Sequence, residues 1–161
     1  EYTAEMKLFV ETDSGDITGK VVKEEKRRDF LNSEIDEKIK KFCDIEYMQK
    51  PPIYSAIKIN GMKLYEYARK GISVEIPNRE VSIKNIRLIN YNRNDDIVSF
   101  YVRCSKGTYI RSLANDIAKS LGAISTITKL RREKSGDFSV ENSSELKEIN
   151  ADKIISLDYF L

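Results

Sequence analysis

Cys104-Ser-Lys-Gly-Thr-Tyr-Ile-Arg-Ser-Leu-Ala-Asn-Asp-Ile-Ala-Lys-Ser-Leu-Gly122 is the stretch around which this chain is organised. An alternating, strand-like run leads into it. Within the stretch, Leu113, Ile117 and Leu121 recur on one helical stripe, which predicts a helix with one buried side. Gly122 falls where a helix C-cap is expected, because glycine readily adopts the left-handed conformation found there. The stretch therefore predicts a strand, a tight passage and a helix.

Tyr109 and Arg111 stand at the predicted junction between strand and helix. The first backbone N–H groups of a helix have no partner within the helix, so such a junction suits anions and phosphate groups. A purely structural interpretation is also open. In that case Tyr109 is a core residue with a satisfied hydroxyl, and Arg111 is solvated.

Two further strands precede the junction. Val81 to Tyr91 and Ile97 to Cys104 are separated by the turn sequence Asn92-Arg-Asn-Asp95, which predicts a hairpin. The alternation in the first strand changes phase near Lys84-Asn85, which indicates a bulge. After the helix, Ala123 to Arg132 has the pattern of another strand.

The N-terminal part begins with an alternating strand pattern from Tyr2 to Val10. Thr12 to Gly19 is rich in turn residues, and Lys20 to Lys23 is predicted to return as a short strand. Asp13 and Asp16 in this loop have some resemblance to a calcium loop, but a turn fits better because no further ligand series follows.

The middle of the chain mixes helix and hairpin signals. Asn32 or Ser33 is predicted to cap a helix with Ile35, Ile39 and Phe42 on one face. After Pro51-Pro52, we expect a strand over Ile53 to Ile59 and a hairpin turn at Asn60-Gly61. Two helical turns over residues 64–70, a cap at Gly71 and a short strand over residues 74–76 complete this part.

The C-terminal part carries weaker signals. Asn142-Ser-Ser-Glu145 is similar to a capping box before a short helix, and Ile154 to Leu161 has the character of a domain end. Together the patterns predict one domain over residues 1–161. The class is α+β, with a mixed, largely antiparallel sheet flanked by helices.

Composition limits the functions that the chain can have. The net charge is +2 with 34% charged residues, so a nucleic-acid surface requires local clusters. Candidates are residues 23–28, residues 129–134, and Lys106 together with Arg111. A solvated face is the alternative for each cluster and is favoured for residues 23–28. Cys43 and Cys104 are predicted to be buried, reduced thiols. The chain has no His, and we expect neither a metal site nor a membrane span.

Several long strings of this sequence resemble one family. Cys104-Ser-Lys-Gly-Thr-Tyr-Ile-Arg111, Gln49-Lys-Pro-Pro-Ile-Tyr-Ser-Ala-Ile-Lys58 and Gly61-Met-Lys-Leu-Tyr-Glu-Tyr-Ala-Arg-Lys-Gly71 are similar to segments of the bacterial TruB-type tRNA pseudouridine synthases. Residues 2–5, residues 12–19 and Leu130-Arg131-Arg132 resemble further segments, in family order. The resemblance covers nearly the whole chain.

The resemblance implies a function. The family isomerises the T-loop uridine of tRNA (uridine-55) to pseudouridine, without a cofactor or metal. The implied partner is the T-arm of tRNA, and the implied location is the cytoplasm. Two other classes stay open from the sequence, namely a non-catalytic RNA-binding module and a plain α+β interaction domain.

The resemblance also implies roles for individual residues. Tyr109 matches the active-site tyrosine and Arg111 the arginine that pairs with the catalytic aspartate. Tyr2 matches a tyrosine that stacks on the flipped base, and Leu130 an apolar residue that lines the pocket. Aromatic and apolar walls restore the stacking that an extruded base loses. Three basic residues are candidates for phosphate contact: Lys106, Arg131 and Arg132.

The family's catalytic aspartate lies in a Gly-Thr/Ala-Leu-Asp-Pro segment, and this sequence contains no such segment. Asp13, Asp16 and Asp116 stand in other contexts, and Asp116 is expected to be solvated or locally ion-paired. We therefore expect this chain to be the central and C-terminal part of a catalytic domain, inactive by itself. An exposed sheet edge or apolar surface would then favour self-association.

Overall fold

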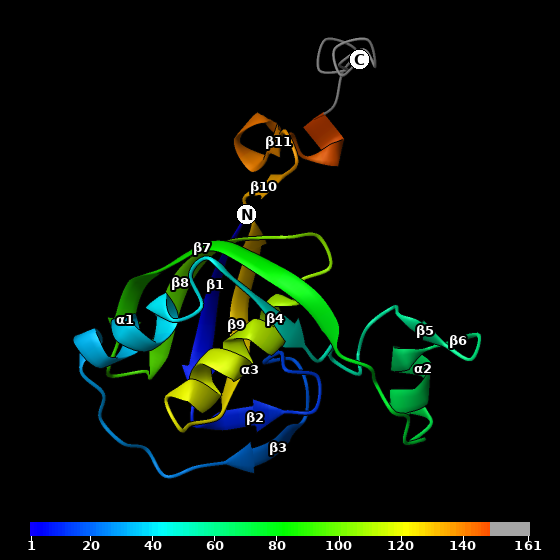
Figure 1. The fold of residues 1–161 in the computed structure, drawn as a ribbon, viewed down its shortest axis with the longest axis horizontal. Coiled ribbons are helices and arrows are strands. Elements are labelled where there is room, and N and C mark those ends of the chain that lie inside the picture. Colours follow the sequence, from blue (N-terminus) through cyan, green and yellow to red (C-terminus); the bar gives the residue numbers. More distant parts are fainter. Residues whose placement is uncertain (149–161) are drawn as a thin grey trace.

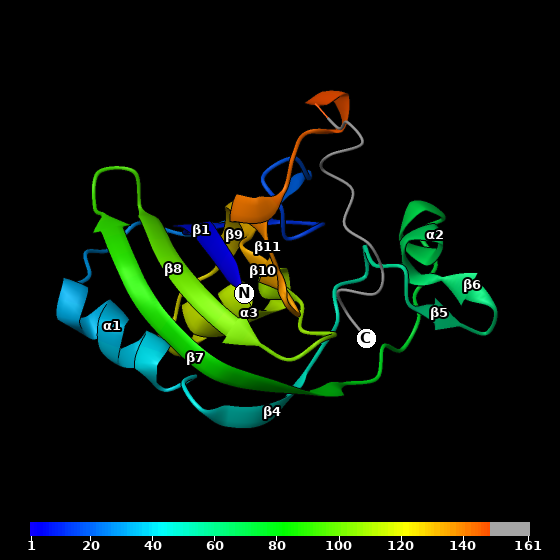
Figure 2. The ribbon, with the colours of Figure 1, turned by 90° about the horizontal axis from the view of Figure 1, so that it is seen from above.

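The computed structural model describes residues 1–148 and is built on a five-stranded antiparallel sheet (Figure 1). Its strand order is β4 (Ile45–Gln49), β7 (Arg79–Asn92), β8 (Ile97–Cys104), β1 (Tyr2–Leu8) and β9 (Ser125–Arg132). Helices α1 (Asn32–Lys40) and α3 (Ile110–Ser120) pack on this sheet (Figure 2). The α+β class expected from the sequence is confirmed.

Short elements extend from this framework. β2 (Val10–Thr12) pairs with β3 (Val21–Glu24), and β10 (Lys134–Ser135) pairs with β11 (Phe138–Ser139). β5 (Lys58–Ile59), β6 (Met62–Lys63) and α2 (Leu64–Arg69) form a small lobe that projects from the sheet in Figure 1. Two 3₁₀ helices, Val140–Asn142 and Leu146–Glu148, follow β11.

The core lies between the sheet and the two helices. Strand β1 buries alternate side chains, and helix α3 buries the predicted stripe of Leu113, Ile117 and Leu121. Phe9 ends β1 because it adopts a φ of 67°, which turns the chain toward β2. Its ring stacks on Phe30 with centroids 6.0 Å apart, so the strained residue is held by packing.

Several local predictions are confirmed. Asn60 and Gly61 both have positive φ, 50° and 81°, as the predicted hairpin turn requires. Gly122 adopts a φ of 66° after α3. The register of β7 against β8 shifts between Ile83 and Asn85, where the bulge was expected, and shifts again between Leu88 and Asn90.

Other local predictions are wrong. Residues 53–57 form no strand, and only Lys58–Ile59 pairs, while the sequence analysis missed β4 at Ile45–Gln49. Residues 74–76 are also outside any strand. The cap of α1 is Leu31, with no side-chain hydrogen bond. Cys43 and Cys104 are free but only partly buried. The predicted domain end at residues 154–161 lies outside the described residues.

Hydrogen bonds, one of them between buried hydroxyls, hold the loop after β2 against β9. Thr12 is 4% exposed, and its hydroxyl donates to the carbonyl of Asp16 at 2.8 Å. The same oxygen lies 2.8 Å from the hydroxyl of the buried Thr126 on β9. The main chain adds two bonds, from Ile17 N–H to the Ile127 carbonyl and from Ile127 N–H to the Gly15 carbonyl. These contacts hold residues 12–17 against the sheet.

We expect Thr12→Val to destabilise the chain by about 1–3 kcal/mol, because the buried Thr126 hydroxyl loses its partner. The Asp16 carbonyl keeps its bond from the Gly19 N–H at 2.8 Å. Equilibrium urea unfolding measures the change. The matched control is Thr18→Val in the same loop, whose exposed hydroxyl should cost no more than ~0.5 kcal/mol. Equal costs for the two variants would contradict the role given to Thr12.

Candidate active site

Tyr109 is the N-cap residue of α3, with φ −93° and ψ 111°. Its backbone N–H donates to Oε1 of Gln49 on β4 at 2.8 Å. Gln49 is 1% exposed, so this bond lies inside the protein. One of the N–H groups at the helix start, which have no partner within the helix, is therefore satisfied by a side chain from another element.

Arg111, the second residue of α3, joins two loops to the helix. Its Nη1 donates to the Ser14 carbonyl at 2.7 Å, and its Nη2 donates to the Tyr54 carbonyl at 2.8 Å. Both bonds are partly buried. A guanidinium group has five N–H donors, so three remain for another acceptor such as a carboxylate.

A cavity of about 190 Å³ lies beside Arg111. Residues of the loop after β2, the segment Lys50–Ile53 and α3 line it, among them Arg111, Asn115 and Lys119. Carboxylates of Glu11, Asp13 and Asp116 also line the cavity, so its charge is mixed. Of the candidate site residues in the described part of the chain, only Arg111 belongs to its wall.

Tyr2 and Leu130 lie on neighbouring strands. Tyr2 packs against the core and pairs with Arg132 across β1 and β9, whereas Leu130 pairs with Ala4. Ala4 is buried in the core that α3 covers, and directly paired residues project to the same face of a sheet. Leu130 therefore lies on the α3 side, where it is 47% exposed. This places Tyr2, Leu130 and α3 on one face.

Arg132 is attached to Tyr2 rather than simply solvated. Its Nε donates to the Tyr2 hydroxyl at 3.1 Å, and its guanidinium carbon lies 5.3 Å from the centre of the Tyr2 ring. Arg131 forms an exposed ion pair with Glu133 at 3.4 Å. Lys106 is exposed in the passage between β8 and α3. Among the described residues, no hydrogen bond, ion pair or ring contact joins these three basic residues directly to Tyr109.

Sequence reasoning missed Gln49, Ser14 and the backbone of Tyr54 as parts of this site. Every residue has a main-chain carbonyl, so the residue type does not reveal which two carbonyls accept from Arg111. Only the tertiary structure identifies them. Gln49 gives one signal in the sequence, since it is a polar residue directly before Lys50-Pro51-Pro52 in one of the family-like strings.

The three aspartates have structural roles in the described chain. Asp13 accepts the Lys20 N–H, and Asp16 accepts the Thr18 hydroxyl and N–H. These bonds, with the Thr18 hydroxyl first, lower the pKa of Asp16, and the charge of Arg111 adds to the effect. The predicted turn roles of Asp13 and Asp16 are therefore confirmed.

Asp116 is partly buried, and this burial raises the pKa of its carboxyl. Lys119 at 3.9 Å, the local partner expected from the sequence, and the Tyr47 hydroxyl at 3.3 Å oppose this shift. The group is thus neither fully solvated nor placed beside Arg111 in an ion pair. It links α3 to β4.

Asp116→Asn should stabilise the chain at pH 7. Because the folded pKa of Asp116 is raised, ionisation costs stability once the pH rises above the ordinary value of 3.8. The amide avoids that cost and still accepts the Tyr47 hydroxyl. We expect a gain in Tm of at most ~2–4 °C, equivalent to about 1 kcal/mol for a domain of this size.

Calorimetry from pH 3 to pH 8 measures this difference, which should vanish below the ordinary pKa, where both side chains are neutral. The control is Asp29→Asn, since the Asp29 side chain is 77% exposed. A gain that persists unchanged at pH 3 would contradict the burial argument.

Comparison with known proteins identifies the family. The family model described as "TruB family pseudouridylate synthase (N terminal domain)" matches residues 1–110. This chain belongs to the TruB family. A tRNA pseudouridine synthase B from Clostridium tetani is 48% identical over 154 residues, covering 96% of this chain and 52% of that protein. One from Mycoplasma mycoides is 41% identical over 157 residues, covering 98% and 54%.

The chain therefore spans about half the length of these TruB relatives. Among solved structures, the "Crystal Structure of a Cbf5-Nop10-Gar1 Complex" contains a chain that is 26% identical with a TM-score of 0.62. That match covers 91% of this chain and 33% of the other. The relatives are named as tRNA pseudouridine synthases, which are isomerases, and the solved structure shares the fold of the α+β sheet described above.

No helix among residues 1–148 has the length and apolar character needed to cross a membrane. Within the same residues, His, Cys, Asp and Glu form no group of three or more suited to a metal ion.

Proposed function

We propose that this chain supplies one wall of a tRNA pseudouridine synthase active site, for the T-loop uridine (uridine-55). The observation that carries the proposal is Arg111 at the start of α3, held by two main-chain carbonyls with three N–H donors left over. A fixed guanidinium of this kind can keep a catalytic carboxylate ionised and aimed through a bidentate pair.

Tyr109 and Tyr2 are the proposed aromatic residues of the site. Tyr109 would lie against the target base and is the candidate to accept its C5 proton, and Tyr2 would stack on the flipped ring. Leu130, exposed on the α3 side of β9, would complete the apolar wall. Base stacking on such side chains is worth roughly 1–3 kcal/mol per base. No cofactor is required by this scheme.

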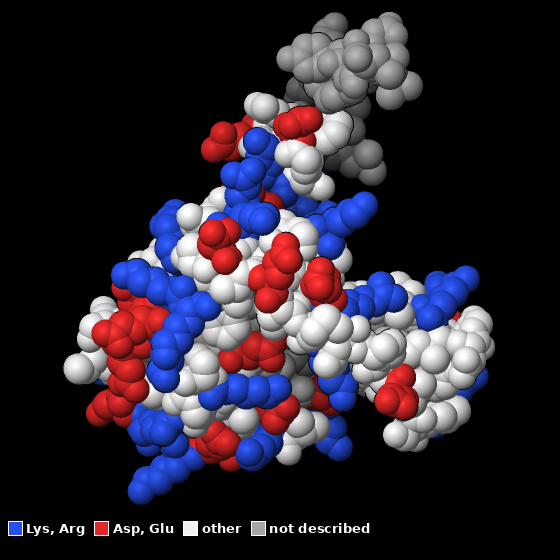
Figure 3. Space-filling view, in the orientation of Figure 1, with Lys and Arg blue, Asp and Glu red and all other residues white. Residues whose placement is uncertain are grey.

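Lys106, Arg131 and Arg132 are the proposed phosphate contacts for the T-arm. In the face shown in Figure 3, Lys and Arg are interspersed with Asp and Glu, so binding must use local groups rather than a uniformly basic face. Arg132 is ordered by Tyr2, which would link phosphate contact to the position of the stacking ring. Such an enzyme is expected in the cytoplasm, where tRNA is processed.

A second candidate is an RNA-binding module without catalysis. It is favoured by one observation, namely that no Gly-Thr/Ala-Leu-Asp-Pro segment occurs in the 161 residues. Both candidate functions have the T-arm of tRNA as the ligand, but only the synthase forms pseudouridine. The exposed apolar side chains of Met48 on edge strand β4 and Leu130 on edge strand β9 support the further expectation that the isolated chain self-associates.

We expect residues 1–161 alone to form no pseudouridine in tRNA, because the nucleophilic carboxylate is missing. The complete gene product, in the same assay, should convert uridine-55 with multiple turnovers. Mass spectrometry after cyanoethylation of pseudouridine measures both. Clear turnover by residues 1–161 would overturn the proposed inactivity, and no activity in the complete product would overturn the enzymatic function.

In the complete gene product, Arg111→Lys should lower kcat by ~10²-fold, since one ammonium cannot bridge both carbonyls and still aim a carboxylate. Single-turnover kinetics on a T-arm hairpin measure the effect, and thermal unfolding shows whether the fold survives. Arg87→Lys is the matched control, because Arg87 contacts the Tyr101 ring on the sheet at 5.1 Å and has no proposed role. Wild-type kcat in the Arg111 variant would exclude Arg111 from the chemistry.

A further inference from the structure

Gln49 is a deeply buried polar side chain at the start of α3. It is 1% exposed, and both ends of its amide are used. Oε1 accepts the backbone N–H of Tyr109 at 2.8 Å, and Nε2 donates to the Tyr47 hydroxyl at 2.7 Å. A buried amide with matched partners at both ends is fixed in orientation, because any rotation leaves polar groups unsatisfied.

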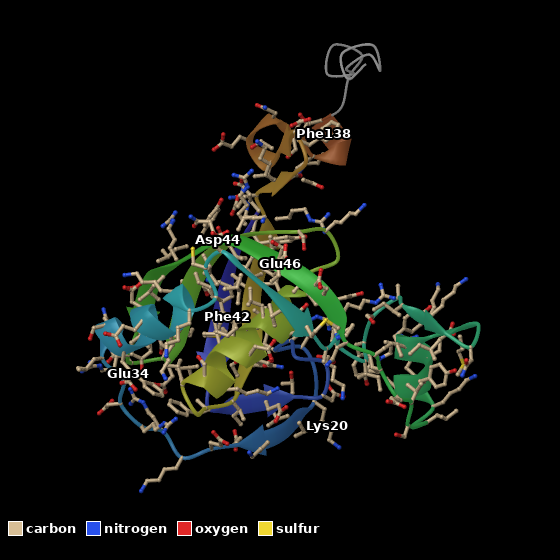
Figure 4. The ribbon with its side chains drawn as sticks, viewed as in Figure 1. Lys20, Glu34, Phe42, Asp44, Glu46 and Phe138 are labelled. Atoms are coloured by element: carbon tan, nitrogen blue, oxygen red, sulfur yellow. The ribbon has the colours of Figure 1, made fainter. Side chains whose placement is uncertain are left out.

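Tyr47 continues the connection to a second point on α3. It lies two residues before Gln49 on β4, on the same face of the strand, and its hydroxyl donates to Oδ2 of Asp116 at 3.3 Å. Burial raises the pKa of Tyr47, so the hydroxyl keeps the proton that it donates. Phe42, labelled in Figure 4, packs edge to face on the Tyr47 ring with centroids 6.0 Å apart.

Tyr47, Gln49, Tyr109 and Asp116 thus form one network, which we call the Gln49 network. It attaches edge strand β4 to α3 at the N-cap and again seven residues later, about two turns along the helix. Two attachment points on one helix fix both its position and its rotation about its axis. The network therefore sets the direction in which Tyr109 and Arg111 leave the helix start.

We propose that Gln49 is a positioning residue for Tyr109, which it holds through the main chain without touching substrate. This inference rests on the proposed function, since it assigns the network a purpose in that reaction. An amide offers an acceptor and a donor at one end of the side chain without a change of protonation. An ionised Glu lacks the donor, and Met lacks both.

Ser112 provides a matched comparison. Its hydroxyl donates to the Lys50 carbonyl at 2.7 Å, so it also ties α3 to the end of β4, and Ser112 is 9% exposed. It has no bond to Tyr109. Variants at Gln49 and Ser112 therefore both remove a buried hydrogen bond between the same two segments. Only the Gln49 variant leaves the Tyr109 N–H without its acceptor.

The experiment compares Gln49→Met with Ser112→Ala in the complete gene product. We expect Gln49→Met to lower kcat by ~10²-fold at a nearly unchanged KM for tRNA, because misplacement of a reacting group by about 1 Å has that effect. Ser112→Ala should keep kcat within about threefold of wild type while losing similar stability. Selective ¹⁵N-tyrosine labelling follows the Tyr109 amide, whose hydrogen exchange should accelerate at least ~10-fold in Gln49→Met only.

Each outcome decides a separate point. Faster Tyr109 exchange with wild-type kcat would overturn the positioning role, and unchanged exchange would overturn the hydrogen bond itself. If the wild-type complete gene product forms no pseudouridine, the proposed function is overturned. The hydrogen exchange of the Tyr109 amide would still test the Gln49 network in that case. Tyr47→Phe serves if Gln49→Met does not fold. It removes the acceptor of Gln49 Nε2 as well as the bond to Asp116, so the amide that accepts the Tyr109 N–H loses its fixed orientation. This variant should lower kcat by several-fold, and wild-type kcat in it would then overturn the inference.

Discussion

The start of α3 depends on hydrogen bonds from outside the helix. Ser14, Gln49 and Tyr54 all lie far from α3 in the sequence. The carbonyls of Ser14 and Tyr54 accept from Arg111, and the Gln49 side chain accepts from the Tyr109 N–H. The first turn of a helix carries N–H groups without partners, and a guanidinium has more donors than one acceptor can satisfy. The loop after β2, which hydrogen bonds already hold against β9, and the segment after β4 supply acceptors that meet these needs.

The packing of α3 on β1 and β9 places the helix on the same side of the sheet as the other candidate residues. The helix covers the face from which Tyr2 and Leu130 project, so residues 128 positions apart in the sequence share one side of the sheet. The Arg132 guanidinium packs on the Tyr2 ring and donates to its hydroxyl. Regular elements hold most of the candidate residues, which is the arrangement that precise chemistry requires.

Local sequence patterns predicted the helices and strands that bury apolar side chains on one face at regular spacing. The stripe of α3, the alternation of β8 and the Asn60-Gly61 turn each contain their own signal. Strand β4 was missed because it lies at the sheet edge, exposes Met48 and buries the polar Gln49, which inverts the expected pattern. The strand expected over residues 53–59 failed for a related reason, since residues 53–57 bond to α2 and Arg111 instead of a strand.

The sequence by itself determined the α+β class, the strand-to-helix junction and, through its long strings, membership of the TruB family. It also identified Tyr109, Arg111, Tyr2 and Leu130 as candidates, because their residue types and positions match that family. Only the tertiary structure decided how α3 is held, because main-chain carbonyls and a buried amide act through position rather than residue type. Hydrogen bonds between residues tens of positions apart follow from packing of the sheet and helices, and no local pattern encodes them.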